Sequence, residues 1–131
     1  MIRFNRLSLN EARAAIAPMV GNRKWDTSDG LCGVDDLIGG GVAFEAHDEC
    51  GARCVFVVEQ VQLEHGMQLE IRVARQYGAA TDLTERMLPE VERYFGAGCK
   101  SVLIWTRRPG LMRKLQAAGY SQAAVIMRKD I

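Results

Sequence analysis

The sequence has no apolar run approaching the about 20 residues that a helix needs to cross a bilayer. Its first residues, Met1 to Glu11, alternate apolar with polar and charged side chains and do not resemble the apolar core of a secretory leader. We therefore expect a cytoplasmic protein with no membrane partner. In that compartment the four cysteines are expected to be free thiols.

The sequence also lacks an excess of charge of either sign. It has 17 basic and 16 acidic side chains, which leaves a formal net charge of +1. A balanced chain has no general attraction for nucleic acid or for an anionic membrane surface. Any anion-binding site must therefore be local, and the composition gives no strong nucleic-acid signal.

Paired cysteine motifs of the zinc-binding type are missing as well. His47, Cys50, Cys54 and His65 could be read as metal ligands, but their spacing is not the C-x-x-C pattern of a zinc finger or ribbon. Cys54 also leads directly into an apolar run at 55–58 that reads as a strand. We predict no metal site.

No repeat, low-complexity tract or linker divides the 131 residues, of which 48% are hydrophobic. This length suits one domain, residues 1–131, that can bury a core of its own. Ser8 and Glu11 have the spacing of a capping box, so we expect a helix to start there. Its apolar stripe consists of Ala12, Ala15, Ile16 and Met19.

Three strands are expected next, over 41–46, 54–63 and 67–74, joined by tight turns as an antiparallel meander. Alternation in the third strand places four apolar side chains on one face, namely Met67, Leu69, Ile71 and Val73. The polar residues Gln68, Glu70 and Arg72 fall on the other face.

The second half alternates helices and strands. A helix is expected from Asp82, with Glu85 completing a second capping box and with Pro89 kinking or splitting it. An apolar strand over 101–106, buried on both faces, a helix beginning at Pro109 and a last strand over 123–128 follow. A helix that crosses from one strand to the next makes strands 67–74 and 101–106 parallel. The predicted fold is therefore α/β, with a mixed sheet.

The stretch 75–82 lies between a strand and a helix and is rich in small residues. Such a loop lets backbone approach a ligand, and the helix start offers N–H groups to an anion. A tight structural connection is the alternative.

Arg75, Gly78 and Ala80 fit the Q/R-x-x-G-x-G/A loop of the GCN5-related N-acetyltransferases (GNAT), which binds the pyrophosphate of acetyl-CoA. The segment Arg108 to Tyr120 is similar to that family's segment ending in K-x-G-F.

The resemblance spans residues 42–129 and implies a GNAT-like N-acyltransferase fold that binds acetyl-CoA. The cofactor contacts that it implies are Val73, Arg75, Gly78, Ala79, Ala80, Thr81 and Asp82. Two positions depart from the family, because Arg108 stands where members usually carry Asn and Leu115 where they usually carry the Tyr that acts as general acid. Trp105, Arg107 and Arg108 end a strand near the expected cleft, where they would contact the cofactor or merely cap the core.

Glu70 is the candidate general base, because family members often use a strand carboxylate to deprotonate the amine. The alternative is a surface ion pair with Arg72. Glu45 and Glu59 are weaker candidates of the same kind. For the missing acid the sequence offers the hydroxyls of Tyr120 and Tyr77, each of which also has a purely structural interpretation.

These residues predict an acyl-CoA-dependent N-acyltransferase that acts on a small amine or a protein amine. The alternative is a GNAT-fold binding or assembly module that has lost catalysis, such as an accessory protein of a phage or mobile element; an unrelated α+β interaction domain is a third interpretation. Four acidic residues would form a rim for a cationic amine or simply a solvated loop, namely Asp26, Asp29, Asp35 and Asp36. The oligomeric state is open, a homodimer included.

Overall fold

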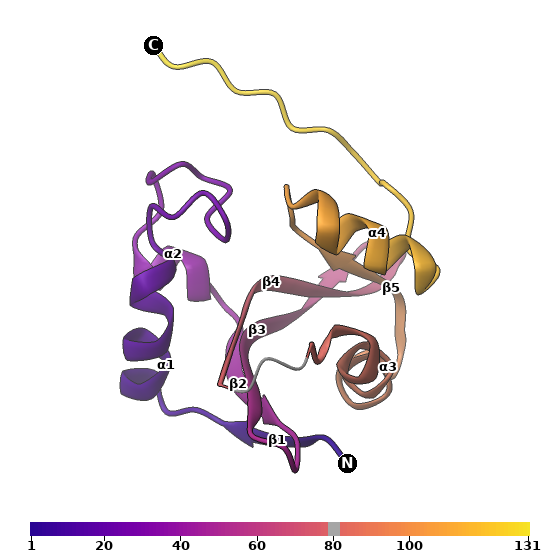
Figure 1. Ribbon diagram of the computed structural model, residues 1–131. Coiled ribbons are helices and arrows are strands. Elements are labelled where there is room, and N and C mark those ends of the chain that lie inside the picture. Colours follow the sequence, from indigo (N-terminus) through magenta and orange to yellow (C-terminus); the bar gives the residue numbers. More distant parts are fainter. Residues whose placement is uncertain (79–81) are drawn as a thin grey trace.

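A single five-stranded sheet organises the chain in the computed structural model, which describes residues 1–78 and 82–131 (Figure 1). In spatial order its strands are β1 (Arg3–Arg6), β2 (Val42–His47), β3 (Ala52–Leu63), β4 (Gly66–Gly78) and β5 (Cys99–Ile104). The helices are α1 (Leu9–Ile16), the 3₁₀ turn η1 (Ala17–Met19), α2 (Val34–Ile38), α3 (Thr84–Phe95) and α4 (Pro109–Ala117). No helix of the described residues is both long and apolar enough to cross a membrane.

The sheet is mixed, as predicted. Strands β1 to β4 pair antiparallel with their neighbours, whereas β4 and β5 pair parallel, across the crossover that contains α3. The parallel pairing runs from Met67 opposite Cys99 to Ile71 opposite Ile104. Strand β5 ends at Ile104, whereas β4 continues to Gly78 beyond the end of their pairing.

Helices cover both faces of the sheet, and each face has its own apolar core (Figure 1). On one face α3 packs Met87 and Val91 against Phe56, Leu69 and Ile71. On the other face α1, η1 and α2 pack over the remaining inward side chains, which include Val55, Val57 and Val73.

The predicted capping box starts α1. Glu11 donates its backbone N–H to the Ser8 hydroxyl at 3.2 Å, and its carboxylate accepts the backbone N–H of Ser8 at 3.0 Å. The predicted stripe then buries Ala12, Ile16 and Met19 against the sheet. Local sequence and packing agree here, and the prediction is confirmed.

A β-bulge in β4 overturns the predicted common face of four apolar residues. Val58 pairs with Ile71 and Val57 with Val73, so Arg72 is an extra residue in β4. Because the extra residue reverses the alternation, Ile71 packs beneath α3 while Val73 packs beneath α1.

The element ends also differ from the prediction. Strand β4 runs four residues beyond Ala74 because residues 75–78 keep pairing with β3, down to Gly78 opposite Ala52. Helix α3 runs to Phe95 without being split at Pro89. The short strand β1 was not predicted; it pairs with β2 along the sheet's other edge.

The predicted last strand over 123–128 is not formed. Residues 121–131 belong to no strand or helix and run outside the rest of the fold as an extended, exposed segment (Figure 1). Their apolar sequence favours a strand, but no strand in residues 1–78 and 82–131 pairs with them to supply hydrogen bonds. Strand β5 is consequently an edge strand, and it is partly exposed instead of buried on both faces.

Replacing Ile16 tests the core beneath α1. Its side chain is fully buried, and we expect Ile16→Ala to lower the free energy of unfolding by about 2–5 kcal/mol through lost burial and a residual cavity. Urea denaturation followed by circular dichroism measures this loss. Leu31→Ala is the matched control, because Leu31 is 80% exposed; equal losses in the two variants would contradict this packing.

Candidate active site

Glu70 lies on β4, one residue before the pairing of that strand with β5 ends at Ile71. It pairs in register with Glu59 of β3 and Leu103 of β5. Its neighbours in sequence, Leu69 and Ile71, point toward α3, so strand alternation directs Glu70 to the opposite face. Its side chain is half-buried, and it makes no hydrogen bond or ion pair with any residue in the described part of the chain.

The other two candidate carboxylates on the strands are engaged. Glu59 forms an ion pair with Arg72 at 3.3 Å, so the alternative pairing of Arg72 with Glu70 is not the one adopted. Glu45 binds Arg53 at 3.2 Å and also accepts the hydroxyl of Tyr77. Burial and the hydrogen bond to Glu45 both raise the pKa of Tyr77. Of the three, Glu70 is the carboxylate available to a ligand.

A gap lies between the continuation of β4 and the chain that leaves the end of β5, and it is almost filled. A cavity of about 30 Å³ remains there, which is room for water and not for a thioester. Side chains from both strands line it, and the loop before α2 covers it with Trp25. Trp105, at the end of β5, lines it as well, so both tryptophans of the chain face this gap. The indole N–H of Trp25 is buried without a hydrogen-bond partner in the described residues.

Asp26 holds the covering loop in shape. Its buried carboxylate accepts the backbone N–H groups of Gly21 at 2.7 Å and Ser28 at 2.9 Å, and the Ser28 hydroxyl at 2.6 Å. Burial would raise the pKa of Asp26, but these hydrogen bonds outweigh it and lower the pKa. Asp26 is therefore an internal brace and does not form a rim for a cationic amine.

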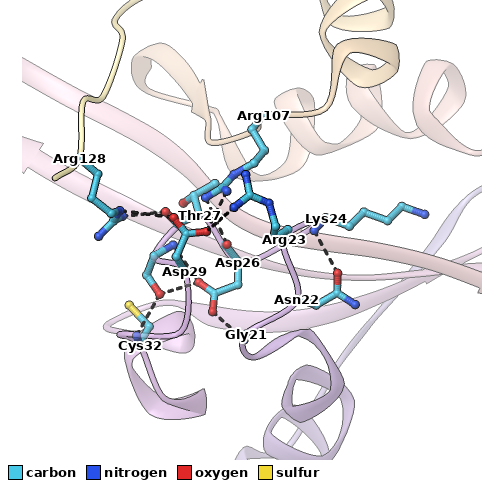
Figure 2. A network of polar contacts seen from close by, with 11 residues as sticks. Gly21, Asn22, Arg23, Lys24, Asp26, Thr27, Asp29, Cys32, Arg107 and Arg128 are labelled. Atoms are coloured by element: carbon cyan, nitrogen blue, oxygen red, sulfur yellow. Dashed lines mark hydrogen bonds and ion pairs between the residues drawn. The ribbon is translucent and has the colours of Figure 1, made fainter. Parts of the chain in front are cut away.

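Asp29 joins the same loop to two distant segments (Figure 2). Its carboxylate contacts Arg107 at 2.9 Å, Arg23 at 3.5 Å and Arg128 at 3.5 Å. The hydrogen bond from Arg107 is the main reason that the pKa of Asp29 is lowered. Since Arg107 follows β5 and Arg128 belongs to the C-terminal segment, we call Asp29 and these three arginines the Asp29 latch.

The predicted cofactor loop is divided between a strand and a helix start. Arg75 and Gly78 belong to β4, whereas Ala79, Ala80 and Thr81 lie outside the described residues. Arg75 places its guanidinium 5.3 Å from the centre of the Tyr77 ring.

Side chains already engage the first amides at the start of α3. Gln76 of β4 accepts the N–H of Leu83 at 2.9 Å, and Asp82 accepts the N–H of Thr84 at 2.9 Å. The predicted capping box of Asp82 with Glu85 is not formed, because the helix starts two residues later than expected and Leu83 occupies its cap position. Asp82 also binds Lys114 of α4.

Gly78 is required by the backbone of the sheet. Its φ is +86°, and a Cβ at this position would lie 2.4 Å from the carbonyl oxygen of Gly51. A larger residue would push apart the end of the β3–β4 pairing. The need for glycine here is thus explained without a ligand.

Tyr120, the predicted acid, lies apart from Glu70. Its hydroxyl is buried without a hydrogen-bond partner in the described residues, and burial together with the charge of Glu92 raises its pKa to about 12. Glu92 is part of α3, which covers the face opposite to Glu70. The structure therefore does not bring the two candidate catalytic groups together.

A second, larger hollow of about 600 Å³ lies between β5, α4 and the C-terminal segment. Tyr120 and Trp105 line it, as do Asp29 and Arg128 of the latch. Neither this hollow nor the position of Trp25 could be predicted from local sequence, because both depend on the course of long connections in the folded chain. The four cysteines are free thiols, and no metal-binding group of His, Cys, Asp or Glu occurs in residues 1–78 and 82–131.

No protein-family model matches this sequence, and a search of curated protein sequences finds no match. The fold is nevertheless similar to solved structures. A transcriptional regulator from Bacillus halodurans C-125 aligns with a TM-score of 0.60 at 10% identity over 100% of both chains. A possible acetyltransferase from Clostridium difficile 630 aligns with 0.52 at 10% identity over 100% of this chain and 97% of that one.

An integron cassette protein from the mobile metagenome of V. cholerae aligns with a TM-score of 0.54 at 8% identity, over 98% of this chain and 92% of that one. At these identities the likeness concerns the fold alone. The fold is thus a single-sheet α+β fold that is similar to those of a transcriptional regulator, a possible acetyltransferase and an integron cassette protein.

The contact of Asp82 with Lys114 can be tested by titration. Burial would raise the pKa of Asp82, but the hydrogen bonds from Lys114 and Thr84 outweigh it and lower the pKa from 3.8 to about 2. Ionised Asp82 therefore stabilises the fold above about pH 4, and this contribution is lost as the pH falls through about 2.

We expect carboxyl carbon NMR to give a midpoint near 2 for Asp82. Lys114→Met should raise that midpoint toward 3.8, because it removes the principal donor. Lys129→Met, a change in the exposed C-terminal segment, should leave it in place. An unchanged midpoint in Lys114→Met would show that the two side chains do not interact in solution.

Proposed function

We propose that this protein is an acyl-CoA-dependent N-acyltransferase, with acetyl-CoA as the expected donor, and that Glu70 is its general base. The observation that carries the proposal is the position of Glu70. It is a half-buried carboxylate without a hydrogen-bond or ion-pair partner among the described residues, one residue before the parallel pairing of β4 with β5 ends. The acetyltransferase-like fold supports the same conclusion.

In the proposed reaction the nitrogen of a neutral amine attacks the thioester carbonyl, and the CoA thiolate leaves with the C–S electron pair. Glu70 takes the proton that the amine loses as the new C–N bond forms. An ammonium ion has no lone pair for this attack, so the base increases the reactive fraction of the amine below its pKa. The acceptor is a small amine or a protein amine.

The acyl group would enter the gap between β4 and β5, which requires Trp25 to move out. The loop that carries Trp25 is held by the Asp29 latch, whose ion pairs are partly exposed and consequently weak. Residues 78–82 would approach the pyrophosphate, with Gly78, Ala79, Ala80 and Thr81 supplying backbone N–H groups. Val73 lines the gap, and Arg75 would contact the cofactor as the resemblance implies. This arrangement rests on the resemblance to the acetyltransferases and on the place of the loop before α3.

A binding or assembly module without catalysis is the second candidate. Two observations favour it. The gap holds only about 30 Å³, and the N–H groups of the cap residue Leu83 and of Thr84, the first residue of α3, are engaged by Gln76 and Asp82. A mobile-element origin is consistent with the integron cassette neighbour, a likeness that concerns the fold alone.

Titration with acetyl-CoA separates the two candidates. Because Trp25 and Trp105 both line the gap, we expect acetyl-CoA to change the intrinsic tryptophan fluorescence in a saturable way. Calorimetry should give the same dissociation constant. Absence of both signals would reject the acyltransferase and leave the module as the better account.

Glu70→Gln tests the base directly. It keeps the side chain's shape and removes its basicity, so we expect unchanged affinity for acetyl-CoA and a rate of thiol release lower by ~10²–10⁴ on any accepted amine. The panel should include polyamines, aminoglycosides and lysine peptides. The deficit should shrink at high pH, where the amine is already neutral.

Glu64→Gln is the matched control, because Glu64 is an exposed carboxylate at the turn between β3 and β4. It should retain the native rate. Equal rates for Glu70→Gln and the native protein would remove Glu70 from the mechanism while leaving acetyl-CoA binding a separate question.

A further inference from the structure

The sheet has two edges, and only one of them is protected. Strand β1 is four residues long and carries Arg3 and Arg6, features that discourage pairing with another chain. Strand β5 is six residues long and ends in the apolar run Val102-Leu103-Ile104. In the described part of the chain no strand pairs with its outer side. Because the first half of β5 carries the exposed Lys100 and Ser101, the run 102–104 is the part of this edge that needs a cover.

The same chain carries a strand-like segment that pairs with no strand of the described residues. Residues 123–127 read Ala-Ala-Val-Ile-Met, and all are exposed, with Val125 at 68%, Ile126 at 64% and Met127 at 87%. β-branched and other apolar residues of this kind favour a strand. Five residues also match the six of β5 in length.

The segment is held away from its own β5. Its start is fixed where Tyr120 donates its backbone N–H to Leu115 at 2.9 Å. Arg128 then binds Asp29 at 3.5 Å and the carbonyl oxygen of Thr27 at 2.9 Å. Between these two anchors the segment spans the outside of the hollow of about 600 Å³ described above. Figure 1 shows it, in yellow, running clear of the sheet.

We propose that two copies of this chain exchange their C-terminal segments. Residues 123–127 of each copy fill the hollow of the other and pair with the outer edge of its β5. One two-fold operation would then satisfy both free edges and bury both apolar segments, since an isologous contact uses the same surfaces twice. The occupant is a second copy because this chain supplies the missing strand in the right length and chemistry.

Light scattering coupled to gel filtration tests the association. The native protein should have twice the 14.5 kDa mass of one chain. Val125→Asp should reduce it to the monomer mass, because a carboxylate would be placed in an apolar groove. Ile131→Asp, beyond the apolar run, should remain dimeric. Circular dichroism confirms that both variants are folded, which their exposed positions favour.

Isotope-filtered NOE spectroscopy on a mixture of labelled and unlabelled copies identifies which strands meet. We expect contacts between the methyl groups of Val125 or Ile126 in one copy and those of Val102 or Ile104 in the other. A native protein that is monomeric throughout a dilution series would overturn the proposal. So would such contacts found only within one copy, which would mean that the segment folds back on its own β5, or a Val125→Asp variant that stays dimeric.

Discussion

The pairing of β4 determines where a site can form in this molecule. The strand is paired with β3 from Gly66 to Gly78 but with β5 only as far as Ile71, so the pairing of β4 with β5 ends at one defined place. The extra residue Arg72 lies immediately after that point and reverses the faces of the residues that follow. Val73 consequently packs beneath α1, and Arg72 takes Glu59 as its partner. The availability of Glu70 follows from the same irregularity.

Much of the fold could be predicted from local sequence, because its signals are local. The Ser8–Glu11 capping box sets the start of α1, and a helix between two apolar strands requires their parallel pairing. The bulge at Arg72 could not be predicted, since it depends on the match between β3 and β4 and not on a residue type. Propensity correctly indicates an extended chain over 123–128, but it says nothing of which strand lies alongside.

The position of the candidate site in the sequence could be predicted, but the interactions of its side chains could not. Alternation along a strand predicts that Glu70 is on a polar face. That it has no ion-pair partner among the described residues depends on Arg72, which pairs with Glu59 instead. Likewise, small residues mark the loop before α3, but nothing local shows that Gln76 and Asp82 take up amides there. Trp25 reaches the gap through a long loop whose course Asp26 determines, and such placement is a tertiary property.

The Asp29 latch connects the two proposals physically. One carboxylate holds the loop that closes the gap and, through Arg128, the C-terminal segment that we assign to exchange. Moving that segment onto a second copy would break the ion pair of Arg128 with Asp29, the carboxylate that also ties the Trp25 loop to Arg107. Because each contact is partly exposed and screened by solvent, the latch can yield without unfolding the two cores on either face of the sheet. Association and access to the gap that Trp25 covers would then be coupled through Asp29, with no change in the sheet itself.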